Sequence, residues 1–138
     1  MIDNQQWTHI WMKRTLARIP GGALVQAHSG RDEVMAHLAA GHHLLGVYAP
    51  REATQEQHVY IAERGIVFFE QGWHFLPYSS IAGVTVDLTG TSKMAAERAK
   101  VRCDDGTTCI VTIVGGGPRD RDVFEFIRFL SRTADAHR

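Results

Sequence analysis

The sequence predicts a mainly β, α+β domain, in which one or two helices are followed by seven antiparallel strands and a C-terminal helix. Three observations predict this order. Apolar residues recur with the helical period of about 3.6 near the N-terminus. Short apolar runs separated by turn residues fill 43–114, and a strongly amphipathic segment covers 122–134. A β meander followed by one helix is typical of a small β domain closed by that helix.

The N-terminal part of the chain is predicted to be helical. A first helix is expected over 3–19, because Trp7, Ile10 and Trp11 follow the i, i+3, i+4 spacing of one helical face. A second, short helix is expected over 31–40, where a serine precedes the segment and a glycine follows it.

Seven strands are predicted from runs of β-branched and aromatic residues. They cover residues 43–49, 58–62, 66–69, 73–76, 84–88, 98–103 and 109–114. Asp105 and Gly106 predict a hairpin turn between the last two strands, and Gly65 is expected to supply a positive φ in an earlier turn. Pro77 excludes a central strand at the irregular step between the fourth and fifth strands.

The C-terminal helix is the clearest element of the sequence. Asp122 and Glu125 match a capping box at its start. Its predicted inward face consists of Val123, Phe126, Ile127, Leu130 and Ala134. Phe124 and Phe129 are expected at the flanks of this face. A helix this amphipathic must pack on something, so we expect it to cover sheet surface.

Three stretches carry a family resemblance: L-A-A-G-H-H-L-L-G-V-Y at 38–48, V-Y-I-A-E-R-G-I-V-F-F at 59–69 and F-L-P-Y-S-S-I-A-G-V-T-V at 75–86. They resemble the bacterial pleckstrin-homology-like (PH-like) and GRAM-like domain families. The resemblance implies a seven-stranded, bent antiparallel PH-like barrel over 38–138, closed by a C-terminal capping helix. Residues 1–37 lie outside the barrel as an N-terminal helical segment, and we expect a single compact domain overall.

Composition and charge exclude several classes of protein. Lys plus Arg and Asp plus Glu number 15 each in 138 residues, so no global field would gather nucleic acid. There is no apolar run of about 18 residues, so no transmembrane segment is expected, and the polar N-terminus lacks a signal-peptide pattern. With only two cysteines, we expect no disulfide framework. We therefore expect a cytoplasmic location.

Arg51 is a candidate weak anion contact. The resemblance implies that phosphoinositides would be held by Lys and Arg clustered on the first hairpin, which corresponds to the loop 50–57. This loop offers Arg51 alone and adds two glutamates, and we expect the turn at Asp104 and Asp105 to lie near it. The acidic balance argues against phosphoinositide binding.

The sequence shows no recognisable set of catalytic or metal-binding residues. We therefore predict that the chain is not an enzyme and needs no cofactor. His42 and His43 are adjacent on an extended segment and would point to opposite faces. Ser79 and Ser80 lack the G-x-S-x-G pattern of a nucleophile elbow. They are better explained by local hydrogen bonds within a turn.

Cys103 and Cys109 flank the turn between the last two predicted strands. A two-residue turn would put their thiols on opposite faces of the hairpin. A five-residue loop would place them opposite each other, where a strained disulfide becomes feasible. In a cytoplasmic protein, two free thiols are the preferred state.

Trp7 and Trp11 are the candidate partner-binding surface. One interpretation is that their helix packs on its own barrel. The other is that they form a partner or self-association surface, since Trp is enriched at interface hot spots. The leading hypothesis is a non-catalytic PH-like module that binds a protein partner or associates with itself. Self-association would make it a homo-oligomer. The alternatives are a peripheral anionic-lipid-binding domain and an inhibitor or immunity-type protein with one dedicated partner.

Overall fold

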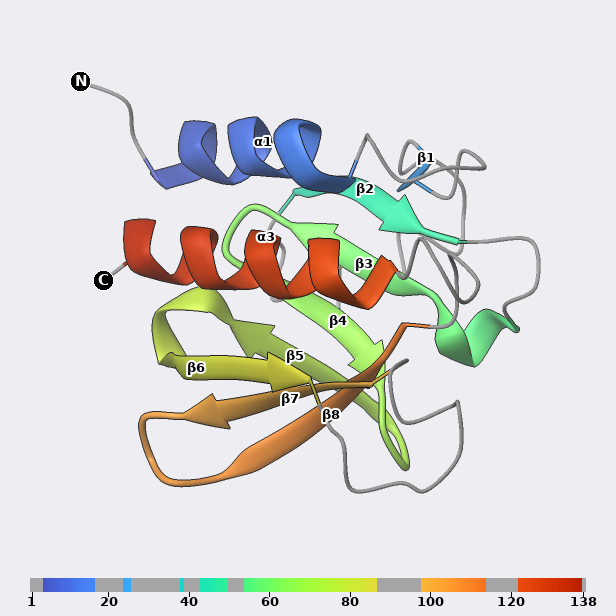
Figure 1. The fold of residues 1–138 in the computed structure, drawn as a ribbon. Coiled ribbons are helices and arrows are strands. Elements are labelled where there is room, and N and C mark those ends of the chain that lie inside the picture. The colour runs from blue at the N-terminus through green and yellow to red at the C-terminus, as the bar shows by residue number, and fades with distance from the viewer. Residues whose placement is uncertain are drawn as a thin grey trace.

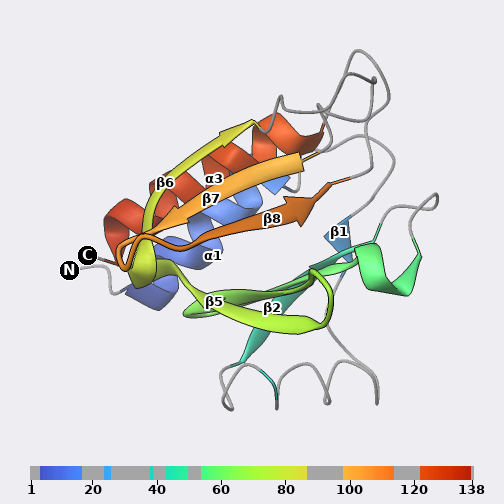
Figure 2. The ribbon, with the colours of Figure 1, turned by 90° about the horizontal axis from the view of Figure 1, so that it is seen from below.

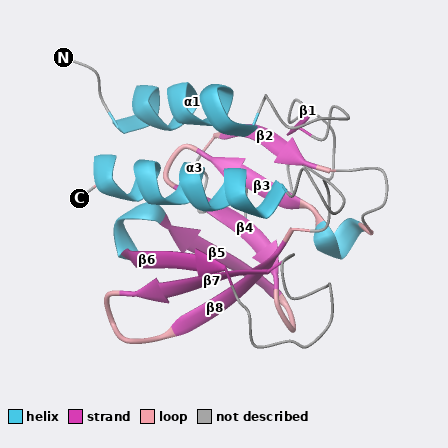
Figure 3. Ribbon diagram, in the orientation of Figure 1, coloured by secondary structure: helices cyan, strands magenta, loops and turns pink. Residues whose placement is uncertain are grey.

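The computed structural model describes residues 4–16, 24–25, 38, 43–49, 54–86, 98–113 and 122–137. These residues form two antiparallel sheets with two helices laid side by side over them (Figure 1; Figure 3 distinguishes helices, strands and loops). The helices are α1 (Asn4–Thr15) and α3 (Asp122–Ala136), and the short 3-10 turns are η2 (Gln55–Gln57) and η3 (Tyr78–Ser80). The strands are β1 (Leu24–Val25), β2 (Leu44–Tyr48), β3 (Val59–Ala62), β4 (Gly65–Phe69), β5 (Trp73–Pro77), β6 (Ile81–Val86), β7 (Arg98–Cys103) and β8 (Thr108–Thr112).

The strands are divided between a five-stranded sheet in the order β1-β2-β3-β4-β5 and a three-stranded sheet in the order β6-β7-β8. Figure 2 shows the two sheets set at an angle to each other, with the chain passing between them through η3. The seven predicted strands are confirmed as β2 to β8, whereas the two-residue β1 was not predicted. Within the described ranges the strands stay in two separate sheets, so their hydrogen bonding does not close a barrel.

The corner between the two sheets is fixed by Tyr78. The backbone N–H of Tyr78 donates to the carbonyl oxygen of Arg64 (3.0 Å), and its hydroxyl donates to that of Ala62 (2.9 Å). Tyr78 is fully buried, and desolvation holds the pKa of its hydroxyl well above the ordinary value. Pro77 ends β5, an edge strand of its sheet, where a missing N–H is tolerated. The irregular step predicted at Pro77 is confirmed.

One hydrophobic core is shared by both sheets and both helices. Its largest fully buried side chains from the sheets and η3 are Tyr48, Ile61, Ile66, Tyr78 and Ile81. The helices add Met12 and Leu16 from α1, and Val123, Phe126, Phe129, Leu130 and Ala134 from α3. The N-terminal helix therefore packs on its own domain, which is the first of the two interpretations given for it.

The buried face of α3 differs slightly from the predicted one. Phe129 is fully buried rather than at the flank, Ile127 is only partly buried at the margin of the core, and Phe124 is 53% exposed. At the start of α3, the buried carboxylate of Asp122 accepts a hydrogen bond of 2.7 Å from the hydroxyl of Tyr48. This bond ties the first turn of α3 to β2.

The middle of the five-stranded sheet, formed by β3 and β4, is buried on both faces. A second cluster packs on the face opposite the main core and contains Val47, Tyr60, Ala62 and Val67. Trp73 packs against this cluster. The centroid of its ring lies 5.9 Å from that of the Tyr60 ring in an edge-to-face arrangement. All four residues of β3 are consequently buried.

Gly65 is required for a different reason from the predicted one. The positive φ values among the described glycines belong to Gly72 and Gly106, not to Gly65. A Cβ at position 65 would instead lie 2.4 Å from the carbonyl oxygen of Leu76 on the neighbouring strand. The close approach of β4 and β5 therefore demands glycine.

The second predicted helix, over 31–40, lies outside the described residues apart from Leu38. The backbone of Leu38 is helical and its side chain is 43% exposed.

Candidate functional site

The orientation of α1 is set by polar as well as apolar contacts. The hydroxyl of Thr8 donates to the carbonyl oxygen of Glu63 (3.0 Å) and lies 2.7 Å from Nε2 of His137. Met12 and Leu16 share the buried face of the helix with Thr8. This face of α1 packs on the core. The tryptophans, which the sequence places at the centre of the apolar face, therefore lie at its edge.

Trp7 and Trp11 lie at this edge and are both partly exposed. Their rings stack, with centroids 6.4 Å apart and planes 16° from parallel. The guanidinium carbons of Arg14 and Arg132 lie 5.5 and 5.7 Å from the centroid of the Trp11 ring, within the range of cation–π attraction. Trp11 also packs against the core. Trp11 thus fastens α1 to α3, while Trp7 extends the aromatic surface outward.

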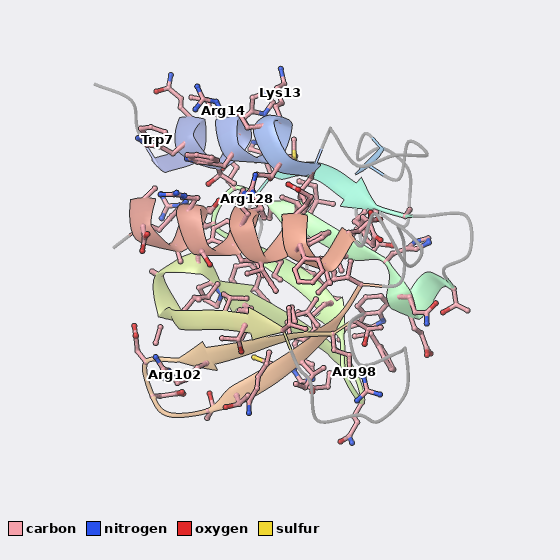
Figure 4. The ribbon with its side chains drawn as sticks, viewed as in Figure 1. Trp7, Lys13, Arg14, Arg98, Arg102 and Arg128 are labelled. Atoms are coloured by element: carbon pink, nitrogen blue, oxygen red, sulfur yellow. The ribbon has the colours of Figure 1, made fainter. Side chains whose placement is uncertain are left out.

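A row of exposed side chains on α3 continues this surface. Phe124, Arg128 and Arg132 are spaced four residues apart and therefore follow one another along the same side of the helix. All three are exposed, and Arg132 reaches Trp11. We call the following six residues the helix-layer face: Trp7, Trp11, Arg14, Phe124, Arg128 and Arg132. Figure 4 shows Trp7 and Arg14 on α1 and Arg128 where α3 borders α1.

The helix-layer face is basic and aromatic. It carries three arginines, and the neighbouring Lys13 on α1 adds a fourth exposed cation, while one exposed acid, Asp135, lies on the same side of α3. Sequence reasoning had singled out the tryptophans but not Phe124, Arg128 and Arg132, although their spacing of four could have indicated them. Aromatic residues and Arg are enriched at protein interfaces, so this composition resembles that of a docking surface.

Arg51, the predicted anion contact, lies outside the described residues. The backbone N–H of Asp104 donates to the carbonyl oxygen of Ser80 (2.9 Å), which places the β7–β8 turn beside η3. Figures 1 and 2 show η2, which belongs to the loop 50–57, at the other end of the molecule. The expectation that Asp104 and Asp105 lie near this loop is therefore wrong, and they add no acidity to it.

Ser80 and His74 each make a local hydrogen bond to the backbone. The hydroxyl of Ser80 donates to the carbonyl oxygen of Pro77 (2.8 Å), which confirms the local turn hydrogen bond predicted for this residue. Nε2 of His74 lies 2.8 Å from the carbonyl oxygen of Glu70. In the part of the chain that the structure describes, no group of three or more His, Cys, Asp and Glu side chains could hold a metal ion.

Cys103 and Cys109 are free thiols on one face of the β7–β8 hairpin. Cys109 pairs with Val101, and the N–H of Cys103 donates to the carbonyl oxygen of Thr107, so the two cysteines lie diagonally across the strands. The hairpin is thus closed by a three-residue loop, with Gly106 at a φ of 88°. Neither loop length considered from the sequence is correct.

The thiol of Cys109 is poorly suited to chemistry. Burial raises its pKa to about 12, and the neighbouring Cys103 and the carboxylate of Glu70 contribute to the shift. Since the thiolate is the nucleophilic form, this thiol is expected to react slowly near neutral pH.

Comparisons with protein-family models, with curated proteins and with solved structures gave no match. No helix among the residues that the structure describes is long and apolar enough to cross a membrane.

Proposed function

We propose that this chain is a non-catalytic, PH-like binding module that docks a protein partner on its helix-layer face. The PH-like part of the proposal is supported by the order of elements. Two antiparallel sheets joined at a corner are followed by a C-terminal helix that packs against that corner and the second sheet. The residues of the Pro77 step, which carry the most specific part of the resemblance, build the corner.

The observation that carries the docking proposal is the exposure of Phe124 beside arginines. Its ring is 53% exposed and lies in one row with Arg128 and Arg132, which leads to the stacked tryptophans. Covering such a ring gains about 1.5–3 kcal/mol for full burial of the side chain. Trp, Tyr and Arg are also the residues whose truncation most often costs binding energy.

The chemistry of this face defines the partner. A partner surface with an apolar recess for Phe124 and acidic side chains opposite Arg128 and Arg132 would be complementary to it. The chain could meet such a surface on another protein or on a second copy of itself. The two free thiols are in keeping with a reducing compartment such as the cytoplasm.

The test compares surface variants that leave the core intact. Trp7→Ala and Phe124→Ala remove exposed aromatic area, whereas Trp11→Ala would also disturb the packing of α1 on α3. We expect the double variant to lose the partner recovered by the wild-type protein, at unchanged Tm. Ser79→Ala, an exposed site at the η3 corner, is the matched control and should retain the partner.

Light scattering after size exclusion decides between a separate partner and self-association. A homo-oligomer that Phe124→Ala converts to monomer would identify the second copy as the partner. If the Trp7→Ala and Phe124→Ala double variant retains both partner and oligomeric state, the docking role of this face is wrong.

A peripheral role on anionic lipid is the second candidate. It is favoured by the combination of Trp7 with Arg14, Arg128 and Lys13, because interfacial surfaces combine aromatic rings with cations. Sedimentation with anionic vesicles at low salt tests this role, and the absence of bound protein would remove it. An inhibitor or immunity-type protein is a special case of the main proposal, in which the helix-layer face has one dedicated partner.

A further inference from the structure

The outer face of the three-stranded sheet carries a stripe of cations. Burial alternates strictly along β7, so that Arg98, Lys100 and Arg102 are exposed while Ala99 and Val101 are buried in the core. Because β7 is the central strand of its sheet, the three cations lie along the middle of this face. We call Arg98, Lys100 and Arg102 the β7 stripe. Figure 4 shows Arg98 and Arg102 toward opposite ends of the lower sheet, far from Lys13 and Arg14.

The described residues that flank the β7 stripe are small or uncharged. The strand register sets Gly83 and Thr85 beside it on β6, and Thr108, Ile110 and Thr112 beside it on β8. A Cβ on Gly83 would lie 3.3 Å from a guanidinium nitrogen of Arg102, so the guanidinium lies across this glycine.

Among the residues that the structure describes, the nearest acids lie at the borders of this face. Asp104 and Asp105 are in the turn beyond Arg102, and the carboxylate of Asp105 is engaged by the backbone N–H and hydroxyl of Thr107 (2.9 and 2.6 Å). Glu70 reaches the outer edge of β8, where its carboxylate accepts the N–H of Ile110 (3.1 Å). The described residues opposite Lys100 at the centre of the face, Thr85 on β6 and Ile110 on β8, are uncharged.

The spacing of the β7 stripe selects among anionic ligands. Alternate residues of a strand are separated by about 6.4–6.8 Å. Alternate side chains of an extended peptide repeat at the same interval, so acidic residues at i, i+2 and i+4 of such a peptide match all three cations. Single-stranded nucleic acid also needs stacking platforms. None of the eight described residues on this face is aromatic.

We propose that the β7 stripe binds an extended acidic segment of a protein partner, with carboxylates at alternate positions along β7. The segment is foreign to this chain, because its 15 acidic residues include no i, i+2, i+4 triplet. Exposed ion pairs are individually weak and are screened by salt, so this binding is modest and salt-sensitive. Binding at the β7 stripe is also independent of the helix-layer face. That face lies on the opposite side of the molecule, where the helices cover the sheets (Figure 4).

An NMR titration of the full chain tests the proposal at low salt. The probe is a short synthetic peptide in which Glu alternates with Thr, and the comparison peptide has the same composition with all Glu residues in one block. We expect shifts confined to backbone amides of β6, β7 and β8, and several-fold tighter binding of the alternating peptide. The triple variant Arg98→Gln, Lys100→Gln, Arg102→Gln should bind it about tenfold or more weakly.

The matched control removes the same charge from the helices. The triple variant Lys13→Gln, Arg14→Gln, Arg128→Gln should bind the alternating peptide as the wild type does, within about twofold. A comparable loss in this control would overturn the proposal, as would equal affinity for the blocked peptide. So would tighter, stripe-dependent binding to phosphatidylserine vesicles or to oligothymidine, which would assign the stripe to a membrane or to nucleic acid. None of these results depends on Phe124, so the two proposals fail separately.

Discussion

The hydrogen bond from Tyr48 to Asp122 joins β2 to the first residue of α3 inside the core. Tyr48→Phe removes the donor, so the buried carboxylate of Asp122 loses this hydrogen bond. We expect the free energy of unfolding to fall by about 1–3 kcal/mol. Urea unfolding measures the cost. Tyr78→Phe is the companion variant, and because its hydroxyl bonds a neutral carbonyl, a smaller loss of about 1 kcal/mol is expected. A Tyr48→Phe protein as stable as the wild type would contradict this role of the bond.

The thiol of Cys109 predicts a loss of stability at alkaline pH. Its pKa rises from 9.0 in the unfolded chain to about 12 in the folded protein. The folded state therefore disfavours the thiolate. The stability that the folded protein gains from keeping Cys109 protonated is complete below pH 9.0 and is lost as the pH rises toward about 12. Tyr78, whose pKa is also raised, acts in the same direction above its ordinary value of 10.0.

The measurement is the Tm as a function of pH for the wild type and Cys109→Ala. We expect the wild-type Tm to fall more steeply above pH 9.0 than that of the variant. Parallel curves for the two proteins would show that Cys109 does not titrate with a raised pKa. Asp105→Asn is the control, because this exposed carboxyl has a lowered pKa, held down by hydrogen bonds from Thr107, and is ionised throughout this range.

Gly65 shows how one position can limit an entire strand pair. Gly65→Ala would force a Cβ to within 2.4 Å of the carbonyl oxygen of Leu76, so β4 and β5 must separate locally. We expect a destabilisation of about 1–3 kcal/mol, typical of overpacking. Gly83→Ala is the comparison, because its Cβ meets the movable end of Arg102 and should cost less. Equal losses in urea unfolding would contradict this distinction.

At the scale of the element, α3 offers a matched pair of phenylalanines. Phe126 is fully buried in the core, against the rings of Tyr48 and Phe129, whereas Phe124 is 53% exposed. Phe126→Ala should destabilise the protein by about 3–5 kcal/mol. Phe124→Ala should change stability by less than about 0.5 kcal/mol, as for most surface substitutions. Thermal and urea unfolding should separate the two variants clearly, and similar losses would mean that the buried face of α3 is assigned wrongly.

The strands were well predicted because their cues are local. Short β-branched runs, Pro77 and the Asp105–Gly106 turn each determine the backbone within a few residues of themselves. The alternation of R-A-K-V-R in β7 could also have indicated one basic and one buried face, although it was not recognised from the sequence. It becomes a site only when β7 is known to be the central strand, which depends on pairing between distant segments.

The orientations of the helices were less accessible from the sequence. The apolar spacing of Trp7, Ile10 and Trp11 favoured a stripe centred on tryptophan, but Thr8 takes a buried position by bonding to the carbonyl oxygen of Glu63. A polar side chain with a distant partner gives no apolar signal. Similarly, Phe124 and Phe129 look alike in the sequence, and only the packing of α3 on the sheets buries one and exposes the other.

At the scale of the whole molecule, α1 completes the core and builds a surface. Its Met12 and Leu16 join the core, while Trp7, Trp11 and Arg14 complete the helix-layer face with α3. The β7 stripe lies on the outer side of the second sheet (Figure 4). A partner seated on the helices would therefore leave the stripe open, so that the module could hold two ligands at once.

The docking of a partner on the helix-layer face is tested most directly by photocrosslinking. Benzoylphenylalanine replaces Phe124 in one variant and the exposed Ser79 at the η3 corner in another, and each is irradiated in the native cell. The docking proposal predicts a discrete adduct from position 124 that is lost with Arg128→Glu and Arg132→Glu and is absent from position 79. No adduct from position 124 in a folded variant, or the same adducts from both positions, would contradict it.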